Sequence, residues 1–171
     1  MMVCPVCGFE NMQGADNCEN CGGDLRTTDI PHPGTRFEAE LVSEPLRALD
    51  PEPPLSLAAE TPVGEAIRTM QERQVDAVLV LEGERLGGIF TERDALLKLA
   101  GRTLDGVTLA EVMTRDPVVL RADDNMAVAI HKMASGRFRH IPVVEGGRAS
   151  GIVTSRDLLG HLIRLLDQPS S

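Results

Sequence analysis

The sequence predicts an α/β (α+β) protein that contains two copies of one β-α-β-β-α unit, preceded by a small cysteine-rich segment. Residues 46–102 align with residues 109–165 without a gap at an offset of 63, and 18 of the 57 aligned positions are identical. All four cysteines lie between positions 4 and 21, outside this repeat. Self-similarity at a fixed offset indicates repeated supersecondary units. We therefore expect domain boundaries at 1–26 (cysteine-rich segment), 27–45 (linker), 46–103 (first repeat) and 104–168 (second repeat).

Each repeat begins with a short strand and a helix. The strands are expected at Leu55–Leu57 and Val118–Leu120. The helices are expected to have Thr61 and Asp124 as N-caps, with Pro62 at the first helical position in the first repeat. Apolar residues with helical spacing follow in both copies: Val63, Ala66, Ile67, Met70, and Met126, Ala129, Ile130, Met133.

A strand pair and a closing helix complete each repeat. The first repeat has apolar runs at Ala77–Leu81 and Leu86–Phe90, and the second has them at Ile141–Val144 and Ala149–Val153. Each pair of runs is separated by a glycine-containing turn, which predicts two strands. Closing helices are expected to start near Thr91 and Thr154, with these apolar residues: Leu96, Leu97, Leu99, and Leu158, Leu159, Leu162, Ile163, Leu166.

Composition limits the compartments and partners of the chain. Hydrophobic residues make up 42% of it, which suffices for a packed core, and no apolar run is long enough to cross a bilayer. The N-terminus has neither the basic start nor the apolar stretch of a secretory signal, so we expect a cytoplasmic protein whose thiols stay reduced. The net charge of −9 disfavours general binding to nucleic acid or to an anionic membrane.

The cysteines form two C-x-x-C-G motifs, in which Cys4 pairs with Cys7 and Cys18 with Cys21. This spacing lets two thiolates reach one ion, and the following glycine lets the backbone fold over the sulfurs. Four thiolates form the tetrahedral set of structural Zn²⁺ and leave no open position for catalysis. The alternatives are two disulfides or free thiols. Zn²⁺ is favoured because the compartment is reducing and so short a segment needs a staple to fold.

The residues between the two motifs are expected to form a short hairpin, and the linker is expected to form a connector. The predicted turn formers of the hairpin are Asn11, Gly14, Asp16 and Asn17. In the linker, Phe37, Leu41 and Val42 are expected to form one short helix or strand that docks on the main domain.

Two families share these patterns. Residues 1–26 resemble compact zinc ribbons, and the two repeats, each with a G-h-h-T-x-R-D motif at the end of the last strand, resemble CBS domains in tandem (a Bateman module). The resemblance implies two CBS repeats packed sheet to sheet about a pseudo-two-fold axis, with clefts between them. It also implies assembly into a homodimer, and binding of AMP, ADP or ATP or, with less support, S-adenosylmethionine or NAD.

Thr91 with Asp94, and Thr154 with Asp157, are the candidate nucleotide ligands. Such pairs at a helix start are also close to a capping box, with Asp in place of Glu or Gln. In the context of the repeat, we expect the carboxylate to accept hydrogen bonds from ribose hydroxyls and the threonine to contact a phosphate or ribose oxygen.

Further candidates would contact the base and the phosphates. Backbone groups around Leu57 and Leu120 are expected to hold the adenine. Arg139 and His140 resemble the basic pair that several CBS proteins direct at phosphates, whereas the first repeat has Asp76 and Ala77 at the matching positions. This charge asymmetry predicts that the two clefts are unequal, unless the pair is simply solvated surface charge.

A non-catalytic sensor that acts in trans on an unidentified protein is the favoured function. The chain lacks a P-loop, a G-x-S-x-G motif and a dinucleotide-binding fingerprint, so an enzyme is disfavoured. The serious alternative is a ligand-free dimerisation scaffold with the ribbon as a protein-contact arm. DNA binding through the ribbon is disfavoured because residues 1–26 carry four acidic side chains and a single basic one, Arg26, so a phosphate backbone would be repelled. The acidic residues are Glu10, Asp16, Glu19 and Asp24.

Overall fold

The computed structural model describes residues 2–4, 7–12, 15–23, 25 and 36–167. The expected turn residue Gly14 and linker residues 27–35 lie outside the described residues. The chain divides into two compact units. The first, called the helical unit below, comprises Met1–Asp50, Ala122–Arg139 and Thr154–Ser171, and the second, the sheet unit, comprises Pro51–Arg121 and His140–Val153. The division cuts through the second repeat, so the units do not coincide with the two sequence repeats.

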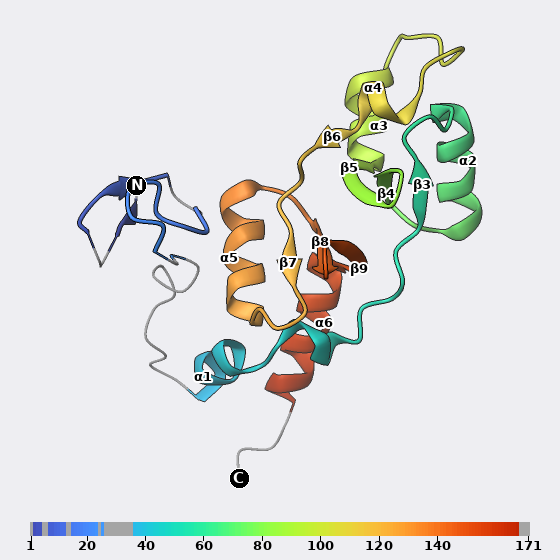
Figure 1. The fold of residues 1–171 in the computed structure, drawn as a ribbon. Coiled ribbons are helices and arrows are strands. Elements are labelled where there is room, and N and C mark those ends of the chain that lie inside the picture. Colours follow the sequence, from blue (N-terminus) through green and yellow to red (C-terminus); the bar gives the residue numbers. More distant parts are fainter. Residues whose placement is uncertain (1, 5–6, 13–14, 24, 26–35, 168–171) are drawn as a thin grey trace. The chain divides into compact units, whose positions relative to one another are not determined.

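The sheet unit contains the first repeat from residue 51 onward (Figure 1). Five elements follow the predicted order: β3 (Ser56–Ala58), α2 (Val63–Arg73), β4 (Ala77–Glu82), β5 (Arg85–Thr91) and α3 (Glu92–Leu99). Two short elements that were not predicted come next and belong by sequence to the second repeat: α4 (Leu109–Val112) and β6 (Thr114–Arg115). The strands form one sheet in the order β3-β4-β5-β6, in which β3 runs parallel to β4 and the other pairs are antiparallel. The short first strand is therefore an edge strand.

The other three strands of the second repeat form a second sheet, whereas β6 pairs with β5 in the first. It consists of β7 (Leu120–Arg121), β8 (His140–Glu145) and β9 (Arg148–Thr154) in the order β7-β8-β9, with β7 parallel to β8. Within the sheet unit, the buried residues Ala77, Leu79 and Ile89 of the first sheet pack against Ala149 and Ile152 of β9. The two sheets thus contact each other through apolar side chains, as the resemblance to tandem CBS domains implies.

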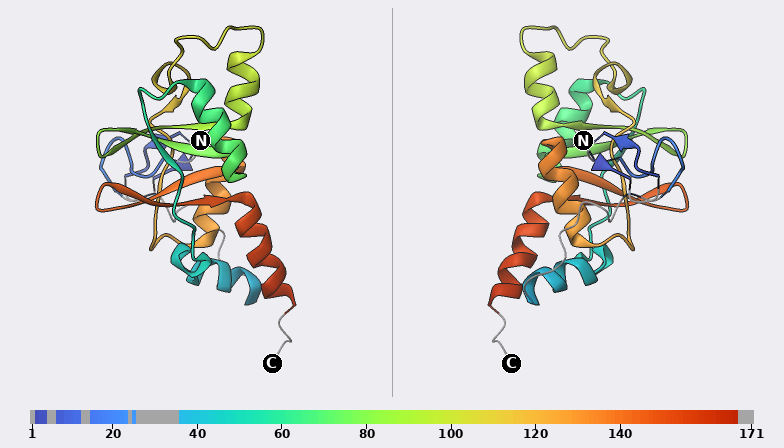
Figure 2. Two further views of the ribbon diagram at one scale, coloured as in Figure 1. Left: turned by 90° about the vertical axis from the view of Figure 1, so that its right-hand side faces the viewer. Right: turned by 90° about the vertical axis from the view of Figure 1, so that its left-hand side faces the viewer.

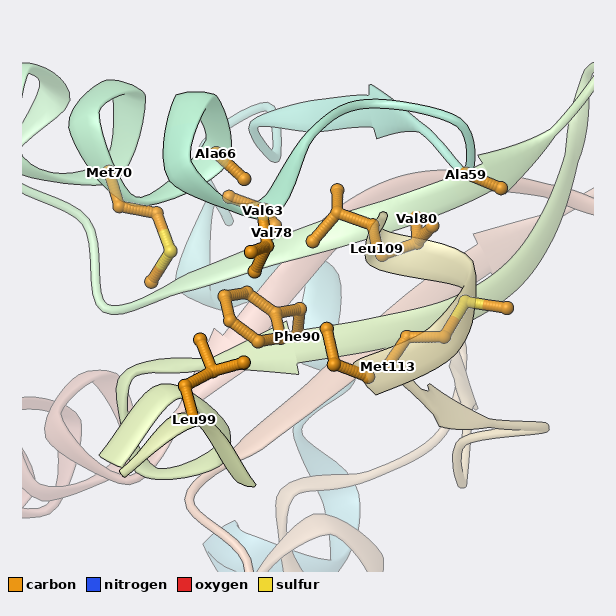
Figure 3. Packing of buried hydrophobic residues seen from close by; sticks show 11 residues of the cluster. Ala59, Val63, Ala66, Met70, Val78, Val80, Phe90, Leu99, Leu109 and Met113 are labelled. Atoms are coloured by element: carbon orange, nitrogen blue, oxygen red, sulfur yellow. The ribbon is translucent and has the colours of Figure 1, made fainter. Parts of the chain in front are cut away.

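The core of the first repeat lies on the other side of its sheet, around the fully buried Phe90 (Figure 3). Helix α2 contributes the predicted apolar residues Val63, Ala66 and Met70, and Ile67 packs at the margin of this cluster. Leu109 of α4 completes it from outside the β-α-β-β-α unit. The apolar residues that alternate along the strands and those that recur every 3.6 residues along the helix therefore pack into one core.

The helical unit contains the helices of the second repeat and the N-terminal segment. Its elements are β1 (Met2–Val3), β2 (Glu10–Asn11), α1 (Arg36–Ser43), the 3-10 helix η1 (Leu46–Leu49), α5 (Met126–Gly136) and α6 (Ser155–Leu166). Helix α1 contacts α5, α5 contacts α6, and α6 contacts η1. Figure 2 shows α1 and η1, in blue and cyan, near the C-terminal half of the red helix α6. The expected short element at Phe37, Leu41 and Val42 is thus a helix.

The segment that precedes each repeat's first strand packs on the other repeat. In the helical unit, the amide of Leu46 donates to the carbonyl of Asp124 at 2.8 Å, and Arg47 donates to Ala122 at 3.0 Å. The sheet unit contains the same two bonds at the offset of 63, because Leu109 donates to Thr61 at 3.0 Å and Ala110 donates to Ala59 at 2.8 Å. Leu46 and Leu109 are both fully buried. The duplication is therefore also present in the structure. In each repeat the segment before the first strand bonds to the other repeat, and these two segments are called the exchanged segments below.

This exchange explains why the predicted N-caps of the first helices were wrong. The carbonyls of Thr61 and Asp124 accept the exchanged segments' amides, so both residues lie one position before the cap. The N-cap of α2 is Pro62, without a side-chain cap bond, and the N-cap of α5 is Asn125, whose side chain accepts from the amide of Val128 at 2.9 Å.

The short first strands also lie one to two residues later than predicted, at Ser56–Ala58 and Leu120–Arg121, because their pairing with β4 and β8 sets the register.

The closing helices are less buried than their apolar pattern predicts. Leu99 and Leu158 are buried, but five of the expected apolar residues are more than half exposed: Leu96, Leu97, Leu159, Ile163 and Leu166.

Within the described residues, none of the helices is long and apolar enough to cross a membrane.

Candidate functional sites: a four-sulfur cluster and two capped helix starts

The four cysteines converge on one point. Their Sγ atoms all lie within 4.8 Å of one another, with Cys4 and Cys21 at 3.7 Å and Cys7 and Cys18 at 3.5 Å. These separations far exceed a disulfide bond of about 2.05 Å, and all four residues are free cysteines. Four sulfurs about 2.3 Å from a tetrahedral Zn²⁺ would lie about 3.8 Å apart. The cluster therefore has the donor set and the spacing to hold a metal ion.

The two C-x-x-C-G motifs have the same backbone conformation. Gly8 donates to the carbonyl of Cys4 at 2.9 Å, and Gly22 donates to that of Cys18 at 2.8 Å. Both glycines have φ of +71°, a conformation that is strained for residues with a Cβ. The glycine after each motif is thus required for the tight turn that directs two sulfurs to one side.

The hairpin predicted between the motifs includes residues 13 and 14, which lie outside the described residues, so it stays a prediction. The hairpin that forms, β1 with β2, encloses the first motif and pairs Met2 with Asn11. Asn11 is buried in β2 rather than in a turn, because its side chain connects the two motifs. Its Nδ2 donates to the carbonyl of Phe9 at 3.0 Å and approaches the Cys18 Sγ at 3.6 Å, while its Oδ1 accepts from the amide of Glu19 at 3.0 Å.

The sulfurs crowd one another enough to change their ionisation. Burial raises the pKa of Cys18, but hydrogen bonds from the amides of Cys21 and Asn20 outweigh it and lower the pKa to about 6. The amide of Gly23 lowers the pKa of Cys21, but the sulfur of Cys7 and burial raise it to about 12. Four adjacent thiols cannot all ionise unless a cation compensates the charge. The cluster is therefore suited to a divalent ion.

In the first repeat, the predicted pair Thr91 and Asp94 forms a capping box at the start of α3. The Asp94 Oδ2 accepts from the amide of Thr91 at 3.0 Å and from its hydroxyl at 2.9 Å, and the Thr91 Oγ1 accepts from the amide of Asp94 at 3.2 Å. The other oxygen, Oδ1, accepts from Lys98 at 2.8 Å and from the Thr114 hydroxyl at 3.4 Å. Both oxygens of this carboxylate are therefore occupied.

These contacts determine the charge state of Asp94. Burial raises its pKa, but the hydrogen bonds from Lys98 and Thr91 outweigh burial, so the pKa lies below its ordinary value of 3.8. The carboxylate is ionised at neutral pH and held in place by an ammonium group.

In the second repeat, Thr154 and Asp157 form the same box at the start of α6 with one difference. The Asp157 Oδ2 accepts from the amide of Thr154 at 2.8 Å and from its hydroxyl at 2.7 Å, and Asp157 donates its amide to the Thr154 Oγ1 at 3.2 Å. Within the part of the chain that the structure describes, no side chain or amide donates a hydrogen bond to Oδ1, and Asp157 is exposed. His161 stands at the position of Lys98, and its Nε2 contacts Glu44 at 2.5 Å instead.

Arg139 and His140 go to different places. The carbonyl of Arg139 accepts from the amide of Ser155 at 2.9 Å, so Arg139 lies at the N-terminus of α6 beside the Thr154 and Asp157 box. Its side chain is exposed. The side chain of His140 is nearly buried and lies 2.9 Å from the Asp76 carboxylate in the sheet unit. Asp76, which was predicted to distinguish the first repeat from the basic pair of the second, therefore contacts one member of that pair, His140.

The backbone around Leu57 and Leu120 lies in edge strands. Leu57 in β3 pairs with Val80, and Leu120 in β7 pairs with Val143. Because β3 and β7 are terminal in their sheets, each has one side on which its amides and carbonyls lack a neighbouring strand. Such groups can form hydrogen bonds with the edge of a base. The contact of adenine with this backbone stays a prediction.

The sequence model of the CBS domain family matches this chain twice, at residues 46–101 and 109–164. Among curated proteins, the chain is 36% identical over 102 residues to the CBS domain-containing protein CBSCBSPB5 of Arabidopsis thaliana, a match that covers 58% of this chain and 19% of that protein. An uncharacterised protein of Methanocaldococcus jannaschii is 29% identical over 139 residues, or 81% of this chain and 50% of the relative. The chain thus spans about a fifth of the length of the plant relative and half that of the archaeal one.

Solved structures of similar fold include CBS-domain proteins. One is a candidate signal-transduction protein with CBS domains from Burkholderia ambifaria, with a TM-score of 0.65, 28% identity, and coverage of 74% of this chain and 96% of that one. Another is the CBS domain pair of protein MJ0100 in complex with 5-methylthioadenosine and S-adenosyl-L-methionine. It has a TM-score of 0.64 and 25% identity, and covers 72% of this chain and 98% of that one.

Proposed function

This chain belongs to the CBS-domain family, and we propose that it is a non-catalytic sensor that binds an adenine nucleotide and acts in trans on a partner protein. The complex of the structural neighbour MJ0100 with two adenosine compounds supports the ligand class. The observation that carries the proposal is the exposed carboxylate of Asp157, which lies at a helix start beside an exposed arginine.

The second repeat provides the working carboxylate. A ribose offers two adjacent hydroxyl donors, and a carboxylate binds both best when each oxygen can accept. Asp157 has Oδ1 available among the described contacts, whereas both oxygens of Asp94 already accept hydrogen bonds, one of them from the Lys98 ammonium. Binding at Asp94 would require the displacement of Lys98. We therefore expect the ribose to be bound at Asp157, and the first repeat to bind weakly.

Arg139 is the principal phosphate contact. Its backbone is fixed at the N-terminus of α6, where the helix dipole and the amides favour an anion. Thr154 adds a hydroxyl at the same place. His140 is held by Asp76, which would compete with a phosphate for the imidazolium. We therefore assign the larger effect on phosphorylated ligands to Arg139 and a smaller one to His140.

The cysteine cluster holds a structural Zn²⁺. Cys4, Cys7, Cys18 and Cys21 would complete a tetrahedral set, which stabilises the segment without providing a catalytic position. Thiolates remain available in a reducing compartment, so the assignment fits a cytoplasmic protein. Metal content per chain, measured by mass spectrometry of the purified protein, is expected to be one zinc.

A thermal-shift series tests the sensor function. The zinc-loaded protein is melted with AMP, ADP, ATP, S-adenosylmethionine and NAD. A ligand at about 100 times its Kd stabilises the folded state by about 2.7 kcal/mol. At this chain length, this raises the melting temperature by about 5–11 °C. A shift that Asp157→Ala removes and Asp94→Ala retains would support the proposal, whereas no shift with any of the five ligands would contradict it.

A ligand-free dimerisation scaffold is the second candidate. The observation that favours it is a set of exposed apolar side chains on the closing helices: Leu96 and Leu97 on α3, and Leu159 and Ile163 on α6. Apolar faces of this kind commonly cover each other in oligomers. The two functions are compatible, since a sensor can also be a homodimer. Light scattering of Leu97→Glu and Ile163→Glu tests the contact, and a monomeric variant that still binds nucleotide would separate the two functions.

A further inference from the structure

Helix α5 is buried on more than the face that carries its two methionines. Val128 and Lys132 lie one turn apart, about 150° and about 110° round the helix axis from the direction that Met126 and Met133 share. Yet Val128 and Lys132 are only 4% and 8% exposed. A buried ammonium group is costly unless it is paired. Lys132 donates to the Oδ1 of Asp16, which belongs to the cysteine-rich ribbon.

The matching face of the first repeat has no such cover. At the offset of 63, Val128 corresponds to Glu65 and Lys132 to Thr69 on α2. Glu65 is exposed, Thr69 is partly exposed, and the hydroxyl of Thr69 donates back to the carbonyl of Glu65 at 2.9 Å. The first repeat thus keeps polar residues that suit solvent, whereas the second has an apolar residue and a cation that require a docked neighbour.

The fold of the ribbon determines where Asp16 lies. The carbonyl of Asp16 accepts from the amide of Leu25 at 2.8 Å, and Leu25 is buried against Cys4 and Cys18. Asp16 also stands two residues before Cys18. So small a segment has almost no core except around the sulfurs, so its fold depends on the metal. Asp16 is therefore presented to α5 only while the cysteine cluster is assembled.

The rest of the N-terminal segment contacts the same helix. Helix α1 packs against α5, and the amide of Met126 donates to the carbonyl of Glu44 at 3.2 Å. This bond lies in the first turn of α5, and Lys132 lies about 9 Å further along the helix axis. Helix α5 is thus held near its start by the segment around Glu44, and in its second half by the ribbon.

We propose that the ribbon is a metal-dependent clamp on the second repeat, docked on α5 through the pair of Asp16 and Lys132. Metal binding then stabilises α5 and leaves α2 of the first repeat unaffected. The proposal does not depend on nucleotide binding.

Hydrogen exchange of the full-length protein tests the clamp. Amide exchange is measured over residues 63–73 and 126–136 in the zinc-loaded protein and again after removal of zinc by a chelator with a reductant. We expect exchange in α5 to become about tenfold faster, which corresponds to about 1.4 kcal/mol of lost local stability. Exchange in α2 should change by less than about twofold. If residues 7–25 lose protection while α5 keeps it, the clamp is refuted.

Two variants and a matched control separate the clamp from a general effect of zinc. Lys132→Met keeps the long side chain but removes the ammonium group, and Asp16→Asn removes the charge of its partner at an exposed site. In both we expect the ribbon to retain one zinc and α5 to exchange equally with and without it. Thr69→Met makes the corresponding change on α2 and should leave the zinc dependence of α5 intact. A zinc dependence that persists in Asp16→Asn and Lys132→Met would overturn the proposal.

Discussion

Leu46 is the residue on which the exchanged arrangement can be tested most sharply. It belongs by sequence to the first repeat, but it is fully buried in the helical unit, where its amide bonds to Asp124. Leu46→Ala removes three carbon atoms, worth about 2.4 kcal/mol by transfer at about 0.8 kcal/mol each. The remaining cavity raises the expected loss to about 3 kcal/mol, within the range of buried leucine truncations. This lowers the melting temperature by about 6–12 °C at this chain length.

The location of the damage distinguishes exchange from ordinary packing. Hydrogen exchange should accelerate in Ala122–Arg139 and in α6, and less in α2, although α2 belongs to the same sequence repeat as Leu46. Leu109→Ala should do the reverse and act on α2. Leu104→Ala, at a partly exposed loop position, serves as the control and should cost less than about 1 kcal/mol. If Leu46→Ala accelerates exchange in α2 and spares α5 and α6, the reasoning is refuted.

Three further substitutions probe separate features. Asn11→Ala removes the side chain that connects the two metal motifs, so zinc affinity in a competition titration should fall by about 10–100-fold. Asp94→Asn removes a carboxyl group whose pKa is lower in the folded protein than in the unfolded chain. In the wild type this group stabilises the fold above about pH 4, and the stabilisation is lost as the pH falls through the folded pKa. Urea unfolding between pH 7 and pH 3 should show that this part of the pH dependence is missing in the variant. Gly88→Ala would place a Cβ 2.6 Å from the Met113 sulfur and 2.8 Å from a backbone oxygen, and should cost about 1–3 kcal/mol. At the equivalent Gly151 the nearest atom is 3.1 Å away, so the same substitution should cost less in thermal unfolding.

Features that depend on local pattern could be predicted from the sequence. The four cysteines converge because the C-x-x-C-G spacing is a local constraint. The boxes of Thr91 with Asp94 and Thr154 with Asp157 form because three-residue spacing at a strand-to-helix junction suffices for them. The order of strands and helices follows from hydrophobic periods that each segment carries on its own.

Features that depend on distant segments could not be predicted in this way. Thr61 and Asp124 are good cap residues, but the exchanged segments use their carbonyls and move the cap by one residue. Asn11 has the composition of a turn former, and only its burial between the two motifs reveals its role. The pairing of His140 with Asp76, and of Lys132 with Asp16, joins residues 64 and 116 positions apart. The one available signal was asymmetry between the repeats, since Val128 and Lys132 replace polar residues of the first copy.

Calorimetric titration of AMP and ATP into the zinc-loaded wild-type protein, Asp94→Ala and Asp157→Ala tests the central claim most directly. We expect one strong site per chain, lost in Asp157→Ala and retained in Asp94→Ala, because only the second-repeat carboxylate has an oxygen free among the described contacts. Arg139→Ala should weaken ATP more than it weakens adenosine. Equal affinities in all three proteins, or loss in Asp94→Ala alone, would contradict the assignment of the nucleotide to the second repeat.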